Sequence, residues 1–364
     1  MIMRNPEDPL PNAAPAGAHI AAVAVVSPPF KVEQAQADAF LTKHYADRLS
    51  PRSLSLMHKI LEHPSIKERY FALENPECLV DEDPDSRIAR FTHWSVELSA
   101  RAVSDALDQA GLTTGDVSGL VVNTCTGYIC PGISTYLIEK LGLSRTIRAY
   151  DLVGSGCGGA IPNLQVAEML LSGEDEGVVV SVSTEICSAT FQMTDDLSLI
   201  VSNAIFADGA AASVLWKRPE GLELVASAGH YAPECRDDIR YIHKHGQLYN
   251  RISSRLPHLA RKAAAHAVRD VLEPLSLRIE DIRHWALHPG GEKIINAVKN
   301  ELNLSEEQLR PTRSAFAHYG NMSSPTVWFV VCEILAAGIA PGEWCIMLAF
   351  GAGLSAHAYL LRKK

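Results

Sequence analysis

The sequence lacks several features that would assign it to well-defined classes of protein. It has no basic excess, because 33 Lys and Arg stand against 42 Asp and Glu and the net charge is −9. A nucleic-acid groove needs a basic stripe, so we expect no nucleic-acid partner. No apolar run reaches the roughly 18 residues that span a bilayer, and the N-terminus has no apolar signal segment. We therefore expect a soluble, cytoplasmic protein with no membrane span.

Paired cysteine motifs are also missing. The eight cysteines are scattered, with no Cys-x-x-Cys pair, at positions 78, 125, 130, 157, 187, 235, 332 and 345. Several lie in apolar runs, which is typical of reduced, buried thiols with at most one reactive member. What the sequence does have is 47% hydrophobic and 21% charged residues over 364 positions. This composition predicts a large folded core in two or three domains, or in one two-lobed unit.

The order of the predicted elements indicates an α/β fold. Residues 1–18 hold four prolines without periodicity and are predicted to be a flexible tail. A buried strand is expected at 20–27, and a mostly helical stretch with an acidic loop at 74–85 is expected over 33–110. Strands and helices then alternate, with strands at 117–123, 147–153 and 177–184 and helices at 131–141 and 157–172. Such alternation predicts a largely parallel sheet covered on both faces.

An internal repeat gives the strongest organisational signal. A shift of 165 residues aligns SARAVSDALDQAGLTTGDVSGLVV with AAHAVRDVLEPLSLRIEDIRHWAL, and CGGAIPNLQVAEMLLSGEDEGVVV with MSSPTVWFVVCEILAAGIAPGEWC. The same order of helix and strand is thus recovered twice at one offset. We interpret residues 19–218 and 219–364 as two similar halves related by a pseudo-twofold axis.

The repeat also predicts where functional groups gather. Cys157 follows an apolar strand and a Gly-Ser-Gly turn, and it opens a helix; Asn321 lies at the mirrored helix start. His288 ends a strand, as does its repeat partner Asn123. Because functional groups of α/β sheets collect at the carboxyl ends of strands, we expect one crevice. A helix N-terminus stabilises a thiolate, and the flanking glycines let a substrate approach the sulfur.

Other interpretations of these residues remain open. Cys157 could be a core residue, His288 a structural one and Asn321 a helix cap. The spacing His284-x-x-x-His288 invites a metal site, although no third ligand is evident nearby. The segment GSGCGG, with Glu185 ending the next strand, is a loose dinucleotide fingerprint of an oxidoreductase.

Five motifs resemble those of the type III polyketide synthases, the chalcone-synthase-like condensing enzymes, in a bacterial-type form. They are GSGCGGAIPNL around Cys157, IFADGAAASVL around Phe206, LHPGGEKII around His288, HYGNMSSPTV around Asn321, and AFGAGLS near the C-terminus. Their order and spacing follow the family over residues 19–362. The resemblance implies a duplicated thiolase-like fold of five layers, αβαβα, and a homodimer.

The resemblance implies roles for four residues. Cys157 accepts an acyl group from acyl-CoA, and His288 holds its thiolate as an ion pair. Malonyl-CoA then loses CO₂, while His288 and Asn321 donate hydrogen bonds to the enolate oxygen. Phe206 is the gatekeeper beside the malonyl carboxylate, where an apolar wall favours loss of neutral CO₂. No metal and no redox cofactor are implied, since CoA thioesters are the substrates.

Further positions follow from the same resemblance. The positions that line the elongation cavity or flank the catalytic Asn are Cys125, Cys187, Thr190 and Ser323, and the loop with Cys130 reaches into the partner subunit's cavity. Residues placed to bind CoA phosphates are Lys59, His63 and Lys293. The chain departs from the plant pattern at the second gatekeeper phenylalanine, where Tyr249 or Asn250 falls.

The product is predicted from the size of these side chains. The small residues Cys125 and Cys187 and the missing phenylalanine leave room for a long alkyl chain, which gains about 0.8 kcal/mol per buried CH₂. This favours a fatty acyl-CoA starter and an alkylpyrone or alkylresorcinol product. The alternatives are a compact cavity primed by malonyl-CoA or a short acyl group, and a single-round enzyme resembling ketoacyl-ACP synthase III.

Overall fold

The structure is a computed structural model that describes residues 12–13, 17–173 and 177–364. The tail predicted over 1–18 therefore lies mostly outside the described residues. Within it, β1 (Asn12–Ala13) pairs antiparallel with β9, and the flexible tail stays a prediction. No helix among the described residues is long and apolar enough to cross a membrane.

Among the described residues, the first half of the chain contains eight strands and six helices. The strands are β1, β2 (His19–Val26), β3 (Phe30–Glu33), β4 (Glu68–Phe71), β5 (Val117–Asn123), β6 (Arg148–Leu152), β7 (Val178–Ile186) and β8 (Asp208–Trp216). The helices are α1 (Gln34–Tyr45), α2 (Pro51–Leu61), α3 (Pro84–Ala110), α4 (Ile133–Leu141), α5 (Ala160–Ser172) and α6 (Leu197–Ile205). The region 33–110 is thus mostly helical as predicted, but it also contains a β3–β4 ribbon.

The second half repeats the main elements of the first. Its strands are β9 (Leu222–Tyr231), β10 (Ile239–Lys244), β11 (Gln247–Ile252), β12 (His284–Leu287), β13 (Trp344–Gly351) and β14 (Ser355–Lys363). Its helices are α7 (Leu256–Leu272), α8 (Glu292–Leu302), α9 (Glu306–Tyr319) and α10 (Thr326–Ala337). The shift of 165 residues places α3 on α7, β5 on β12, α5 on α10 and β7 on β13.

Strand direction differs from the prediction. The main sheet runs β12-β13-β14-β9-β2-β8-β7-β5-β6. Strands pair parallel only at β5–β6, β5–β7 and β12–β13 within this described path, and the other neighbours pair antiparallel. The sheet is therefore mixed rather than largely parallel. Hydrophobic patterning identifies strands but does not report the direction in which neighbouring strands pair.

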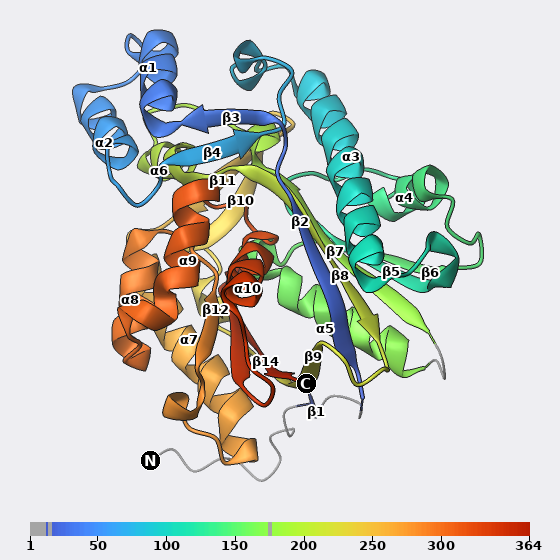
Figure 1. Cartoon of the computed structure of the whole chain (residues 1–364). Coiled ribbons are helices and arrows are strands. Elements are labelled where there is room, and N and C mark those ends of the chain that lie inside the picture. The colour runs from blue at the N-terminus through green and yellow to red at the C-terminus, as the bar shows by residue number, and fades with distance from the viewer. Residues whose placement is uncertain (1–11, 14–16, 174–176) are drawn as a thin grey trace.

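Alternate residues along the strands divide the core into layers (Figure 1). Val180 of β7 packs in the cluster beneath α3 and α4, whereas Val179 packs in the cluster that contains α5 and α10. In the other half, Leu348 of β13 packs beneath α7 and α8, and Met347 faces the same central cluster as Val179. Since successive side chains of a strand point to opposite faces, these contacts produce the expected five layers, αβαβα.

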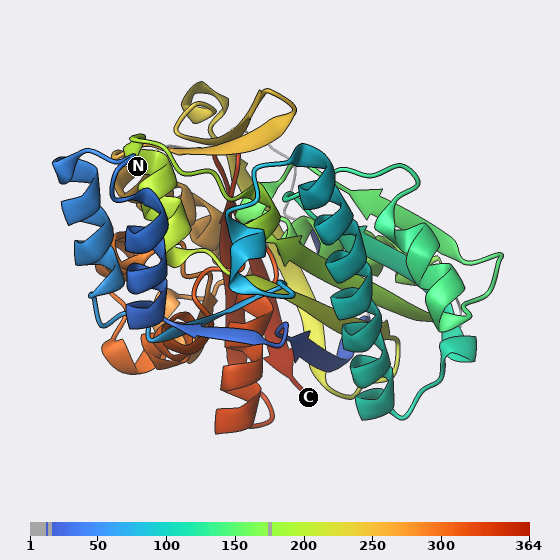
Figure 2. The same cartoon turned by 90° about the horizontal axis from the view of Figure 1, so that it is seen from above.

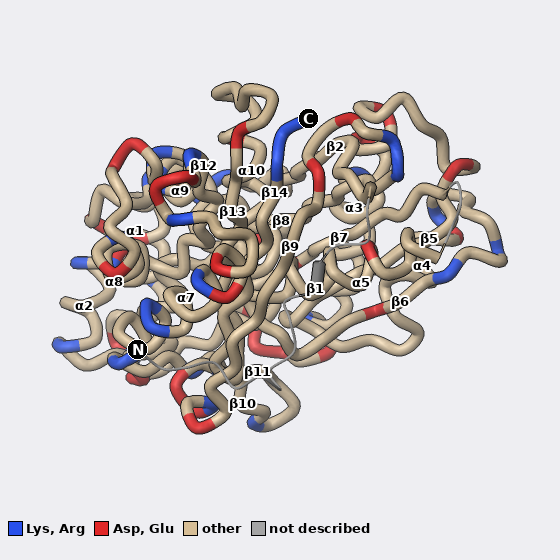
Figure 3. The backbone as a smooth tube through the Cα atoms, turned by 90° about the horizontal axis from the view of Figure 1, so that it is seen from below, with Lys and Arg blue, Asp and Glu red and all other residues tan. Residues whose placement is uncertain are grey.

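Two views show where the remaining elements lie. Seen from above, α1 and α2 (blue) lie at one end of the molecule and α4 with β6 (green) at the other, while the β10–β11 hairpin (gold) projects beyond the sheet (Figure 2). Charged residues of both signs are interspersed over the outer helices and loops, and the central strands are largely uncharged (Figure 3).

Candidate active site

Cys157 lies in a single 3₁₀ turn, Gly156–Gly158, between β6 and α5. The glycines on either side face the turn after β13. A Cβ on Gly156 would lie 2.9 Å from the Ala352 backbone nitrogen, and one on Gly158 would lie 2.9 Å from that of Gly351. The absence of a side chain at these glycines therefore allows the Gly351–Ala352 backbone to approach Cys157. The local sequence pattern did not reveal this role of the glycines.

The three predicted catalytic side chains meet in one place. Cys157, His288, Asn321 and Phe206 all line one cavity of about 50 Å³. His288 follows β12 and is 1% exposed, and its backbone N–H donates to Leu348 O at 2.8 Å. The expectation of one crevice at the carboxyl ends of strands is confirmed. Asn123 instead lies beneath the site, where its side chain hydrogen-bonds Ser183 and Ser324.

Asn321 is fixed through both its backbone and its side chain. Its backbone N–H donates to Ile205 O, and its carbonyl accepts from Ala207 N, each at 2.9 Å, so the peptide flanks the gatekeeper position Phe206. Its Oδ1 accepts the backbone N–H of Ser323 at 2.8 Å. Because an N–H must face an oxygen, this contact orients the amide and leaves Nδ2, a donor, free toward the cavity.

Burial governs the protonation of the thiol and the imidazole. Desolvation raises the pKa of Cys157 to about 11, partly opposed by a hydrogen bond with Ser323. Desolvation also lowers the pKa of His288 to about 3, and neither ring nitrogen has a hydrogen-bond partner among the described residues. Desolvation therefore disfavours both the thiolate and the imidazolium. Burial thus opposes the charged form of each group taken alone, and the ion pair that the family resemblance implies stays a prediction.

Glu185 is a positioning residue that the sequence analysis assigned to a different role. Its carboxylate is fully buried and accepts hydrogen bonds from Cys125 N at 2.9 Å, Thr126 Oγ1 at 2.8 Å and Ser324 Oγ at 2.7 Å. Burial raises the pKa of this carboxyl. An acid with these partners has no access to a ribose, so the dinucleotide interpretation is wrong. A single acidic residue near the end of a Val-rich strand with no other charge was the signal available in the sequence.

The metal interpretation fails for a geometric reason. His284 and His288 lie four residues apart along a strand, not a helix, which separates them by about 13 Å. His284 Nε2 contacts Glu343 Oε2 at 2.8 Å, far from the cavity. Within residues 12–13, 17–173 and 177–364, no three His, Cys, Asp or Glu side chains are grouped as a metal site.

The structure distinguishes the two positions proposed for the second gatekeeper. Asn250 of β11 lines the cavity together with Phe206. Tyr249 does not line it, and the Lys244 ammonium lies 5.4 Å from the centre of its ring. Adjacent residues of a strand point to opposite faces, so of these two residues Asn250 faces the cavity that Cys157 lines.

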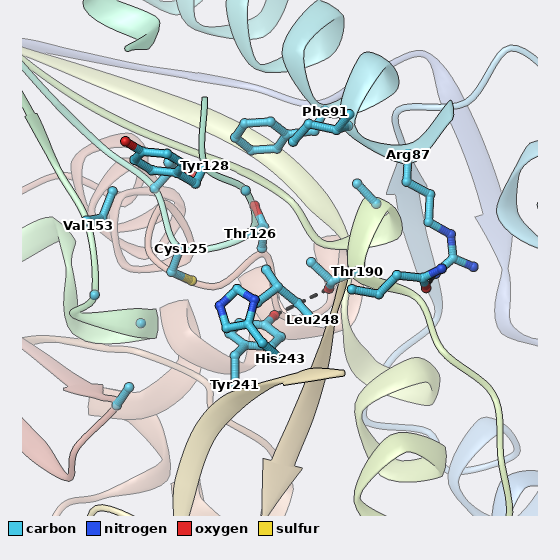
Figure 4. Close-up of a pocket in the computed structure, with 18 of the residues that line it drawn as sticks. Arg87, Phe91, Cys125, Thr126, Tyr128, Val153, Thr190, Tyr241, His243 and Leu248 are labelled. Carbon is cyan, nitrogen blue, oxygen red and sulfur yellow. Dashed lines mark hydrogen bonds between the residues drawn. The ribbon is translucent and has the colours of Figure 1, made fainter. Parts of the chain in front are cut away.

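A larger groove of about 920 Å³ adjoins the cavity around Cys157 (Figure 4). Cys125 and Tyr241 line both spaces, and Thr190 lines the groove. Tyr241, on β10, contacts Thr190 Oγ1 through its hydroxyl at 3.4 Å. The sequence analysis missed Tyr241 because the β10–β11 hairpin carries no motif. Cys125 Sγ lies 3.3 Å from Ser323 Oγ, which places both predicted residues at the site.

The other predicted residues are more dispersed. Cys187 is buried beside Phe206 in a small cavity of about 20 Å³. Cys130 is exposed and lines neither the cavity nor the groove. Lys59 and His63 line an open hollow on α2 that shares no residue with the cavity. Lys293 is exposed in the first turn of α8, next to the cavity residue Ile294.

A duplicated five-layered fold with a partly buried thiol, a buried imidazole and a buried carboxamide in one cavity defines the thiolase-fold condensing enzymes. Residues 25–223 match the family described as FAE1/type III polyketide synthase-like protein, and residues 223–363 match the chalcone and stilbene synthases, C-terminal domain. The chain belongs to the type III polyketide synthases.

Relatives and solved structures agree with this assignment. The chain is 30% identical to 1,3,6,8-tetrahydroxynaphthalene synthase of Streptomyces peucetius subsp. caesius, covering 95% of this chain and 93% of the relative. It is 29% identical to 3,5-dihydroxyphenylacetyl-CoA synthase of Streptomyces toyocaensis, covering 80% and 77%. The crystal structure of PKS-I from the brown alga Ectocarpus siliculosus matches with a TM-score of 0.87 at 27% identity, covering 98% of this chain and 100% of that one.

Proposed function

We propose that this chain loads an acyl group from acyl-CoA onto Cys157, extends it by decarboxylative condensation with malonyl-CoA, and cyclises the product. The observation that carries the proposal is the meeting of Cys157, His288 and Asn321 in one cavity, with the Asn321 amide oriented as a donor. The thioesters supply all the reacting groups, so the proposed reaction requires no metal and no redox cofactor.

Loading begins with removal of the proton from the Cys157 thiol. His288 accepts the thiol proton as the sulfur of Cys157 attacks the acyl-CoA carbonyl. The tetrahedral intermediate collapses to the acyl-enzyme and CoA thiolate, which takes the proton back from the imidazolium. His288 is then neutral again for the next step, in agreement with the low pKa that its burial produces.

Extension uses His288 and Asn321 as hydrogen-bond donors. Malonyl-CoA loses CO₂, and the remaining electron pair forms an enolate whose thioester oxygen accepts hydrogen bonds from His288 and Asn321 Nδ2. One such donor contributes about 10² to 10³ in rate. The enolate carbon attacks the thioester on Cys157 and releases its sulfur, so the chain grows by two carbons. Phe206 excludes water from the departing carboxylate.

The size of the cavity bears on the starter. A water molecule needs about 10–15 Å³ of accessible cavity volume. The cavity around Cys157 has about 50 Å³, so it admits only a few non-hydrogen atoms. This favours malonyl-CoA or a short acyl-CoA as starter. The fatty acyl starter expected from the sequence, leading to an alkylpyrone or alkylresorcinol, requires its tail to pass Cys125 and Tyr241 into the adjoining groove. The names of the two Streptomyces relatives, tetrahydroxynaphthalene synthase and dihydroxyphenylacetyl-CoA synthase, describe products without a long alkyl chain.

Mass spectrometry of products tests the proposal. The enzyme is incubated with malonyl-CoA alone and with acetyl-, hexanoyl-, dodecanoyl- or benzoyl-CoA added. We expect CO₂ release without NAD(P)H and products with two or more extensions. A single extension in every case would instead support the ketoacyl-ACP synthase III-like alternative, and absence of CO₂ release would contradict both. A higher kcat/KM for dodecanoyl-CoA than for acetyl-CoA would establish the long-chain starter.

The remaining parts of the proposal concern binding and assembly. We assign CoA phosphate contacts to Lys59, His63 and Lys293, and a homodimer in which the Cys130 loop reaches the partner's cavity. Residues 19–218 and 219–364 are proposed as the two halves of each subunit, and the cytoplasm as the location.

A further inference from the structure

A further cavity lies between α1, the β3–β4 ribbon and the 3₁₀ turn Pro76–Leu79, and it borders the small cavity that Cys187 lines. Its volume is about 410 Å³, within the range of about 300–1,000 Å³ that small-molecule sites occupy. None of its lining residues lines the catalytic cavity. Most of its wall is apolar, including Phe40, Leu41, Leu73 and Leu79.

Arg69 of β4 is the exception in this apolar wall. The residue is 2% exposed, yet it lines the cavity. Its Nε donates to Gln34 Oε1 at 2.8 Å, and its Nη1 donates to Asn203 O at 2.8 Å and Phe206 O at 2.6 Å. Nη2 has no hydrogen-bond partner in the described part of the chain. It is therefore the guanidinium nitrogen available to a molecule in the cavity.

The charge of this guanidinium is not neutralised by direct contact with an acid. Burial lowers the pKa of Arg69 to about 9, so it remains protonated near pH 7. The negative charge of Asp208 partly offsets this lowering of the Arg69 pKa. The Asp208 carboxylate, however, accepts its hydrogen bonds from Ala72 N and Ser188 rather than from Arg69. None of the described lining residues is Asp or Glu, and Lys31 at the wall already pairs with Glu68 at 2.5 Å.

We propose that this cavity binds an amphipathic monocarboxylate, with its carboxylate on Arg69 Nη2 and its hydrocarbon part against the surrounding Phe and Leu side chains. A buried cation without an anionic partner is costly, and a ligand carboxylate supplies that partner. The apolar wall supplies the affinity for the hydrocarbon part. The same guanidinium holds the carbonyl of Phe206, which links this site to the wall of the catalytic cavity. The proposal does not depend on the condensation reaction.

Calorimetric titration of the full chain with decanoate and with decanol tests the charge requirement. The two probes share a ten-carbon chain and differ in the carboxylate. We expect decanoate to bind at least tenfold more tightly than decanol, and saturating coenzyme A to leave the decanoate affinity unchanged. Equal affinities for the two probes, or displacement of decanoate by coenzyme A, would overturn the proposal, because the second result would place decanoate in the catalytic site.

Two pairs of variants test the location. Ala37→Phe fills the cavity from α1 and should weaken decanoate binding at least tenfold, whereas Ala39→Phe, on the exposed side of the same helix, should not. Gln36→Glu adds a negative charge at the wall with little change of shape, and should weaken decanoate at least threefold without affecting decanol. Gln109→Glu, exposed on α3, makes the same charge change elsewhere. If the two variants of either pair change the decanoate affinity equally, the assigned site is contradicted. Gln36→Glu and its control are conservative changes, so they give an answer even where Ala37→Phe does not fold.

Discussion

The backbone N–H of Ser323 donates to Oδ1 of Asn321 at 2.8 Å, and this contact decides which end of the amide faces the cavity that Cys157 lines. Ser323 has a φ of 60°, an uncommon conformation for a residue other than glycine. The turn is held in place by Thr326, whose Oγ1 donates to Ser323 O at 2.8 Å and accepts from Met322 N at 2.9 Å. The turn thus presents Nδ2 as a donor before any substrate binds.

Asn321→Asp keeps the acceptor for Ser323 and removes the donor. We expect malonyl-CoA decarboxylation to slow by about 10² to 10³, the usual loss for one donor to a developing oxyanion. Acylation of Cys157 by the starter should continue, because it does not require that donor. Both steps are followed separately by CO₂ release and by the mass of the Cys157 peptide. Equal loss of the two activities would mean that Asn321 holds the site together instead.

His288→Ala tests the transfer of the thiol proton. Burial raises the pKa of Cys157 to about 11, and an adjacent proton acceptor is the means available for forming a thiolate. In the variant, the pH midpoint for alkylation of Cys157 by iodoacetamide should move upward by one unit or more. The measurement is the modified Cys157 peptide as a function of pH. An unchanged midpoint would remove His288 as the acceptor. Cys157→Ala, which should abolish starter loading while leaving the fold intact, identifies the modified peptide.

Asn250→Phe tests the second gatekeeper. An aromatic ring at this position narrows the cavity beside Phe206, so products should contain fewer extensions and longer starters should be used less. Tyr249→Phe is the matched control, since Tyr249 lies on the other face of β11 and should leave the product profile unchanged. Product ratios are measured by mass spectrometry. A change caused by Tyr249→Phe and not by Asn250→Phe would reverse the assignment.

Glu168 makes stability depend on pH. This buried side chain of α5 accepts a hydrogen bond from the Tyr359 hydroxyl, and desolvation raises its pKa from 4.5 to about 7. Because the folded state favours the protonated form of Glu168, this carboxyl contributes its full stabilisation below pH 4.5. The stabilisation is lost as the pH rises through 7. At 1.36 kcal/mol per pH unit, the loss in the free energy of unfolding is about 3 kcal/mol. Glu168→Gln should remove this loss and be more stable than the wild type at pH 8.

Urea unfolding at pH 5 and pH 8 measures the effect. The control is Glu333→Gln at the repeat-equivalent position of α10, a less buried residue, for which we expect a smaller difference between the two pH values. A wild type and a Glu168→Gln variant with the same pH dependence would show that Glu168 is ionised in the folded state.

The sequence by itself determined the duplication, the strands and helices of the main layers, and the convergence of Cys157, His288 and Asn321. It could do so because hydrophobic periodicity is local, and because one repeat offset places equivalent strand and helix ends at one edge. Tertiary structure decided the antiparallel pairings and the choice of Asn250 over Tyr249. It also decided the burial that opposes charge on the thiol and the imidazole, the hydrogen bonds of Glu185, and the unpartnered nitrogen of Arg69. These properties depend on which distant residues surround a side chain and how far they exclude water, and a local pattern contains neither.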